Sequence, residues 1–163
     1  MKIIGYLAVL VLLLALALVI AGQSGFFAGK LPHNLGVRDG RLKPPSKTPN
    51  SVSSQAALYP DHPQKDYAAV APLKFSGDGE AAMARLADML QKTERTVVVK
   101  REPGYIYAQS STALLKFTDD VEFWLDRANG VIQVRSSSRL GRKDYDMNRA
   151  RIEALRARFE ANG

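Results

Sequence analysis

The chain has 163 residues, of which 46% are hydrophobic, and it includes six Tyr, six Phe and one Trp. This is enough for one folded domain and excludes a disordered body, but it is too little for two separate cores. There is no Cys, which excludes disulfides, thiolate metal sites and cysteine nucleophiles. Without Lys2 and Lys30, 21 basic residues stand against 16 acidic ones, a charge of +5 that falls short of a nucleic-acid-binding signature.

The first element is the apolar run Ile3–Gly22, twenty residues with no charged or strongly polar side chain. At about 1.5 Å per residue, a helix of this length covers the roughly 30 Å hydrocarbon core of a bilayer. Lys2 precedes the run, so the positive-inside rule keeps the amino end in the cytoplasm. We predict that residues 1–23 span the bacterial inner membrane once, with the rest of the chain in the periplasm.

A cleaved signal peptide is the alternative for this run. Signal peptides usually have an apolar region of about 7 to 15 residues that ends in an A-x-A-like site. Here the run is longer, and the candidate site at residues 15–17 lies inside it. Gln23 stands where a lipoprotein would need its acylated Cys, which excludes lipidation of that kind. The uncleaved anchor is therefore favoured over a cleaved, periplasmic protein.

Residues 24–56 are predicted to be a basic, Pro/Ser-rich tether. The three prolines between residues 43 and 50 disfavour a helix and favour extended or turn backbone. The basic residues of the tether either solvate it or attract it to anionic lipid head groups. They are Lys30, Arg38, Arg41, Lys43 and Lys47.

Residues 57–163 are predicted to form the domain. Its first elements are a short edge strand over residues 69–75, which contain Pro72, and a helix near residues 79–91 that begins at Ser76 or Asp78. The apolar stripe of that helix is Met83, Leu86, Ala87 and Leu90. Strands over residues 95–102 and 105–111 follow, joined by a Pro-Gly turn. If Glu102 pairs with Tyr105, Val97 and Val99 face the core.

A second hairpin joins residues 120–126 to 131–138 through Asn129-Gly130, the strongest signal for a two-residue turn. That turn would place Leu125 opposite Val134, Phe123 opposite Ser136 and Trp124 opposite Arg135. A helix over residues 145–160 ends the chain, begun by Asp144 or Asp146, with one face formed by Asn148, Ile152, Leu155 and Phe159. We therefore predict an α+β domain in which two helices cover an antiparallel sheet of about four to five strands.

The polar face of the second hairpin is the candidate site. It is interpreted either as an ordinary cross-strand cluster or as a concave ligand site in which Trp124 is the platform. Adjacent residues of a strand point to opposite faces, which argues against a catalytic dyad of Asp119 and Asp120. A glycosidase-like pair of Asp120 and Glu122 is a weaker hypothesis. The predicted binding residues are Asp120, Glu122, Trp124, Arg135 and Arg139, together with Asn50, Ser53 and Ser54.

Several motifs resemble those of a known family: residues 36–42, 48–54, 118–123, 135–141 and 148–156. Between Leu35 and Phe159 the chain is similar to the bacterial and plastid domain-of-unknown-function family numbered 1499. In that family two cysteines commonly flank the Pro-Asn element, and the resemblance places Pro45 and Ser51 at their positions, as if a disulfide had been lost as a pair. The family has no established activity, so the resemblance implies location and architecture only.

From these observations we predict a non-enzymatic, membrane-anchored envelope module that binds a partner protein or a lipid-like ligand, and no nucleic acid. Its binding surface would be the hairpin face together with the loop Thr48–Gln55. His33 and His62 both lie in loop-like sequence, so no metal site, cofactor or histidine-assisted nucleophile is predicted. The alternatives are a hydrolase-like enzyme that uses Asp119, Asp120 or Glu122, and a purely structural envelope protein.

Overall fold

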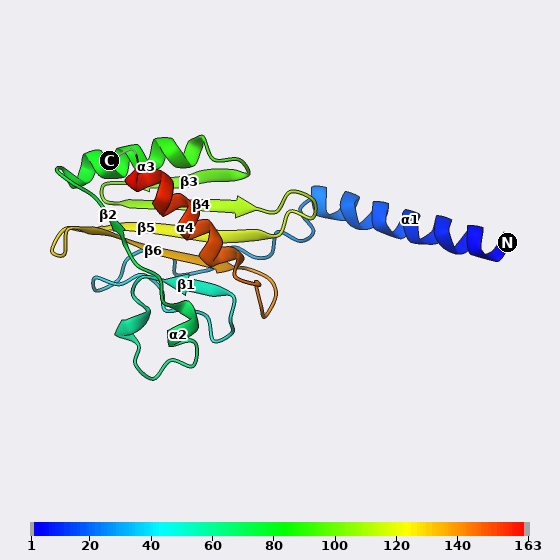
Figure 1. The fold of residues 1–163 in the computed structure, drawn as a ribbon, viewed down its shortest axis with the longest axis horizontal. Helices are drawn as coiled ribbons and strands as arrows, with labels where there is room; N and C mark the ends of the chain where they lie inside the picture. Colours follow the sequence, from blue (N-terminus) through cyan, green and yellow to red (C-terminus); the bar gives the residue numbers. More distant parts are fainter. Residues whose placement is uncertain (1, 162–163) are drawn as a thin grey trace.

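The computed structural model describes residues 2–161. Helix α1 (Lys2–Gln23) projects from one end of a body in which helices lie across a sheet (Figure 1). The strands are β1 (Ser51–Ser53), β2 (Leu73–Lys74), β3 (Thr96–Glu102), β4 (Tyr105–Ser111), β5 (Thr118–Asp126) and β6 (Val131–Ser138). The other helices are α3 (Gly79–Gln91) and α4 (Met147–Glu160), with short turns of helix at η1 (Ala56–Leu58) and α2 (Lys65–Ala68).

Helix α1 is long and apolar enough to cross a membrane, with a mean hydropathy of 3.1 over its most apolar window. None of that window is buried by the rest of the chain. A signal sequence near an N-terminus has the same length and composition, so the helix by itself does not distinguish an anchor from a signal.

The sheet is antiparallel and six-stranded, in the order β1-β6-β5-β4-β3, and β2 also pairs with β6. Helices α3 and α4 lie on one of its faces (Figure 1). This confirms the predicted α+β class, although the sheet has six strands where about four to five were predicted. The edge strand predicted over residues 69–75 is confined to Leu73–Lys74, after Pro72. Strand β1 was not anticipated, because it comes from the segment predicted to be a tether. The domain division at residue 56 stays a prediction, although Ser51–Ser53 pairs with β6.

The face under the helices is the main apolar core. Asp78 caps α3 by accepting a hydrogen bond from Ala81 N at 2.7 Å, and Asp144 accepts one from Asn148 N at 3.0 Å at the start of α4. The buried helical residues match the predicted stripes: Met83, Leu86, Ala87 and Leu90 on α3, and Asn148, Ile152, Leu155 and Phe159 on α4. From the sheet the core receives Ile106, Val121, Phe123, Leu125, Ile132 and Val134.

The register of the β5–β6 hairpin differs from the predicted one by two residues. Asp126 pairs with Val131, which leaves a four-residue loop at residues 127–130 in place of a two-residue turn. The Asp126 carboxylate stabilises the longer loop by accepting hydrogen bonds from Asn129 N (3.2 Å) and Asn129 Nδ2 (2.8 Å). Because the shift is even, every side chain keeps its predicted face. The new register places Glu122, and not Trp124, opposite Arg135.

The β3–β4 hairpin has the predicted pairing of Glu102 with Tyr105, but a bulge lies between Val98 and Lys100. The extra residue reverses the side-chain direction beyond it, so Val98 packs against the core. Val97 and Val99 remain 63% and 51% exposed. The prediction that they face the core was wrong because the sequence pattern does not reveal the bulge.

Candidate functional site

The chain that follows α1 covers the sheet face opposite the helices. Leu42 is buried against Tyr105 and Tyr107, and Leu35 and Val37 pack around this second apolar cluster. We call residues 31–44 the cover segment. The polar face of the β5–β6 hairpin therefore lies under the cover segment.

Glu122 lies at the centre of this roofed face and is completely buried. Its Oε1 accepts hydrogen bonds from Gly36 N (2.7 Å) and from the Tyr105 hydroxyl (2.8 Å). Its Oε2 lies 3.4 Å from Arg135 Nη1. Burial lowers the pKa of Arg135, and the charge of Glu122 opposes that shift. Burial, together with the negative charge of Glu122, raises the pKa of Tyr105.

Asp120 forms the second ion pair on this face. Its carboxylate accepts hydrogen bonds from Arg139 Nε (3.0 Å) and Nη2 (2.7 Å), and from the Tyr107 hydroxyl (2.6 Å). The hydrogen bonds to Asp120 raise the pKa of Arg139. Burial raises the pKa of Tyr107 to about 12, with the hydrogen bond to Asp120 adding to the shift. Arg139 also donates to Ala28 O at 3.4 Å, which connects this pair to the chain just after α1.

Asp119 lies on the opposite face of the sheet from Asp120. Its Oδ2 accepts a hydrogen bond from Arg151 Nη2 of α4 at 2.5 Å. Asp119 and Asp120 thus point in opposite directions, as strand geometry requires. With Glu122, each of the three carboxylates has its own arginine partner and acts as an acceptor in a buried ion pair.

The predicted residues of the Thr48–Gln55 loop hold β1 in place. Asn50 Nδ2 donates to Gly141 O at 2.6 Å, and the Ser54 hydroxyl donates to Gln133 Oε1 at 2.6 Å. Ser53 is buried within β1. These side chains join the loop to β6 and to the chain that follows it.

The Pro-Asn loop is closed by a hydrogen bond. Ser46 N donates to the hydroxyl of Ser51 at 2.7 Å, and Pro45, next to Ser46, is buried. The two positions at which the family resemblance implies cysteines therefore lie at the two ends of one short loop.

An open groove lies between the cover segment and β3–β4. Its volume is about 670 Å³, within the range of small-molecule sites. Of the predicted binding residues, Trp124 lines it, while Asp120, Glu122 and Arg135 are buried in the ion pairs already described. The apolar and aromatic lining is Leu31, Leu35, Val37, Val99, Tyr105, Tyr107 and Trp124, and Lys100 and Glu102 supply charge.

Sequence reasoning missed the wall that the cover segment contributes to this groove. Leu31, Leu35 and Val37 are apolar residues in a stretch otherwise dominated by basic and turn-forming residues. That pattern was the available signal, but it did not predict a wall, because single apolar residues are common on protein surfaces.

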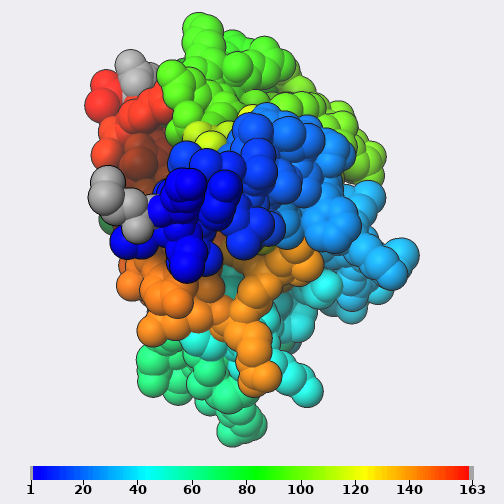
Figure 2. Space-filling model, turned by 90° about the vertical axis from the view of Figure 1, so that its right-hand side faces the viewer, coloured from blue at the N-terminus to red at the C-terminus, as the bar shows by residue number. Residues whose placement is uncertain are grey.

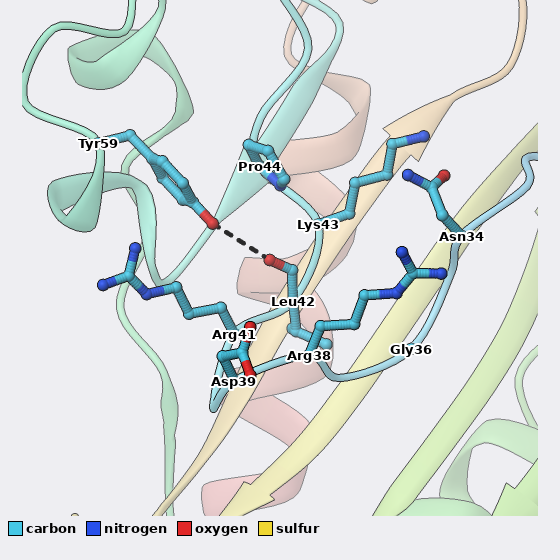
Figure 3. A pocket seen from close by; sticks show the side chains of 9 residues that line it. All are labelled: Asn34, Gly36, Arg38, Asp39, Arg41, Leu42, Lys43, Pro44 and Tyr59. Carbon is cyan, nitrogen blue, oxygen red and sulfur yellow. Dashed lines mark hydrogen bonds between the residues drawn. The ribbon is translucent and has the colours of Figure 1, made fainter.

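A second pocket, of about 400 Å³, gathers much of the basic charge of the segment (Figure 3). Arg38 and Lys43 extend toward Asn34, while the Arg41 guanidinium lies 5.9 Å from the centre of the Tyr59 ring. The single acidic residue in its lining is Asp39. The pocket therefore has a positive lining, in which Arg38 and Arg41 are exposed and Lys43 is half-buried.

The fold and site define an α+β domain joined to a candidate membrane-spanning helix, with a roofed ionic face and an apolar groove beside it. Among residues 2–161, no three His, Cys, Asp or Glu side chains come close enough to hold a metal ion. The chain belongs to the family described as "Protein of unknown function (DUF1499)", which matches residues 41–159. A comparison with curated proteins gives no match.

Proposed function

We propose that the protein is a membrane-anchored, extracytoplasmic module that binds a lipid-like amphiphile in the groove beside Trp124. The observation that carries the proposal is the groove itself, which combines aromatic and aliphatic walls with a charged rim. Lys100 and Glu102 form an ion pair at 2.9 Å on that rim. An acyl chain would lie along Trp124 and Val99, and a polar head group would meet Lys100.

The physical argument rests on exposed apolar surface. Leu31 and Val99 are more than half exposed, although both line a concave site. Covering such surface is favourable by roughly 25 cal/mol per Å². A ligand with an apolar body and a polar end gains this free energy of apolar burial. Its polar end keeps the charges of Lys100 and Glu102 solvated or hydrogen-bonded.

The anchored, extracytoplasmic location is supported by α1 and by the positive charge that precedes it. Lys2 lies directly before the apolar run. The positive-inside rule then orients the domain outward. Carbonate extraction of native membranes and protease shaving of spheroplasts test this location separately from binding.

Trp124 is the only tryptophan of the chain, so its fluorescence reports directly on the groove. We would titrate the full-length protein in nanodiscs with a brominated long-chain fatty acid, using the unbrominated acid as the control. Saturable quenching of Trp124 is the expected result. Val99→Lys should weaken it about tenfold, because a charge would enter the apolar wall. Val97→Lys is the matched control, an exposed valine on the same strand that does not line the groove.

Quenching that rises linearly with added acid, and equally in both variants, would contradict groove binding, because it would reflect only acid dissolved in the bilayer. A protein that is anchored yet shows no saturable quenching would leave the location intact and remove the ligand.

A further inference from the structure

The end of the domain from which α1 emerges exposes a set of large apolar side chains. They lie on the loop between β4 and β5 (residues 112–117) and on the loop between β6 and α4 (residues 139–146), and they continue to the first residue of α4. Leu114 is 60% exposed and Tyr145 is 79% exposed. The other members are Phe117, Leu140 and Met147, and Phe26 joins them from the chain after α1.

The first loop is packed against the end of the apolar helix, and the second contacts the chain just after it, where Arg139 and Leu140 lie against Gly29. Gln23 Nε2 donates to Leu114 O at 2.9 Å, and the Phe27 ring lies 5.3 Å from that of Phe117. Gly22 touches the backbone of Leu115 so closely that a Cβ at residue 22 would lie 2.7 Å from Leu115 Cα. In Figure 2, which looks onto the α1 end, the orange atoms of the chain around residue 140 lie on the same side of the molecule as the helix.

Basic side chains flank the apolar ones in both loops. Lys116 lies in the first loop, and Arg142 and Lys143 lie in the second. Lys143 Nζ is 5.4 Å from the centre of the Tyr145 ring. Of the three acids nearby, Asp119 is buried and paired with Arg151, and Asp144 is buried and bonded to the start of α4. This leaves Asp146 as the exposed negative charge among them.

A hollow of about 340 Å³ lies between the two loops. Its apolar lining is Phe117, Leu140, Tyr145 and Met147, and its charged lining is Lys143 together with the buried carboxylates of Asp119 and Asp144. Aromatic and aliphatic side chains next to basic ones are the composition that proteins place at the boundary between head groups and acyl chains.

We propose that this end of the domain docks on the bilayer surface itself. Leu114, Leu140 and Tyr145 would enter the head-group boundary, while Arg142 and Lys143 would pair with the phosphates of anionic phospholipids. The proposal rests on the anchoring part of the proposed function, because a spanning α1 brings this end of the body against the membrane. It is independent of the groove, and it makes the two loops a lipid-binding surface in their own right.

The absence of Cys makes a direct test possible, since single-Cys variants of the full-length protein carry one label each. An environment-sensitive fluorophore would be placed at Leu114→Cys, at Ala128→Cys in the loop at the other end of β5, and at Leu12→Cys within α1. The proteins would be reconstituted in vesicles of phosphatidylcholine and phosphatidylglycerol that contain a chain-brominated lipid.

We expect strong quenching of the labels at residues 12 and 114, and little at residue 128. Arg142→Glu together with Lys143→Glu should release the label at residue 114, with about a fivefold weaker docking equilibrium for each cation lost at low salt. Pure phosphatidylcholine vesicles should have the same effect. Circular dichroism spectra matching those of the parent chain would show that the fold is kept.

Two results would overturn the proposal, and they differ from each other. In the first, the label at residue 12 is quenched, but the label at residue 114 is quenched no more than the label at residue 128. This result would refute docking and leave the anchoring intact. An unquenched label at residue 12 would refute the anchoring on which both proposals rest.

Discussion

The two faces of the sheet are buried by different means, although the same strands supply both. On β5, Phe123 points into the apolar core under α3 and α4, while its neighbour Glu122 points into the ionic network under the cover segment. The core is held by the burial of apolar surface, which has no directional requirement. The ionic face needs specific donors, so it determines where the cover segment lies.

One buried donor of the ionic face has no hydrogen-bond partner in the described part of the chain. Arg135 is buried opposite Glu122, yet its Nε has no hydrogen-bond partner among residues 2–161. A buried ion pair of this kind stabilises little relative to an apolar pair, but it strongly penalises the loss of one partner. The helix-covered face therefore supplies stability, whereas the ionic face determines the position of the cover segment and with it the shape of the groove.

The sharpest contrast comes from adjacent residues of β5. Phe123→Ala should lower the free energy of unfolding by about 4 kcal/mol, because it removes a fully buried ring from the core. Trp124→Ala should cost about 1–2 kcal/mol, because that ring is partly exposed and borders the groove. Urea denaturation followed by circular dichroism measures both. Equal losses would mean that the two faces contribute alike.

Removing one charge of the central pair should reveal the directional character of the ionic face. Glu122→Leu should cost about 3 kcal/mol, because Arg135 is then buried without its carboxylate. Replacing both residues, Glu122→Leu with Arg135→Met, should recover the part of that loss that comes from the unpaired charge of Arg135. The part due to Gly36 N and the Tyr105 hydroxyl, which lose their acceptor, should remain. A double variant as unstable as the sum of the single variants would contradict the view that specificity, more than stability, is what this pair provides. Urea midpoints of the four proteins complete the cycle.

Low pH should destabilise the helix-covered side of the domain through protonation of Asp144. Burial alone would raise the pKa of this carboxyl, but hydrogen bonds from Tyr67 and Asn148 outweigh it and lower the pKa below the ordinary 3.8. The folded state therefore favours the charged carboxylate of Asp144 more than the unfolded state does. Its contribution to the free energy of unfolding is present above pH 3.8 and is lost as the pH falls through the lower pKa of the folded state. Asp144→Ala should cost about 1–2 kcal/mol at pH 7. The difference from the parent chain should shrink in urea titrations at decreasing pH.

High pH should destabilise the ionic face through ionisation of Tyr107. Of these substitutions, replacing Tyr107 should have the smallest effect on the free energy of unfolding at neutral pH. The pKa of Tyr107 is raised from 10.0 to about 12, so the folded state favours the neutral phenol. Its contribution is complete below pH 10 and is lost as the pH rises through 12. Tyr107→Phe should cost about 1 kcal/mol at pH 7 and remove one late phenolate from the ultraviolet titration. An unchanged titration curve would place that late ionisation on another tyrosine.

Much of this fold was visible in the sequence because its signals are local. The 3.6-residue spacing of Met83, Leu86 and Leu90 and the alternation along residues 120–126 determine which side chains face the core. The length and apolar character of Ile3–Gly22 determine a helix that can span a membrane. The polar residues of the hairpin face were found for the same reason.

The remaining features of the fold depend on contacts between residues that are distant in the sequence. The loop closed by Asp126 and the bulge at Val99 set the registers, and neither changes the hydrophobic pattern that a sequence displays. The hydrogen bond from Gly36 to Glu122 joins residues 86 positions apart and holds the segment predicted to be a tether against the sheet. Periodicity identifies the two faces of a strand, but only the packed chain determines what covers each of them.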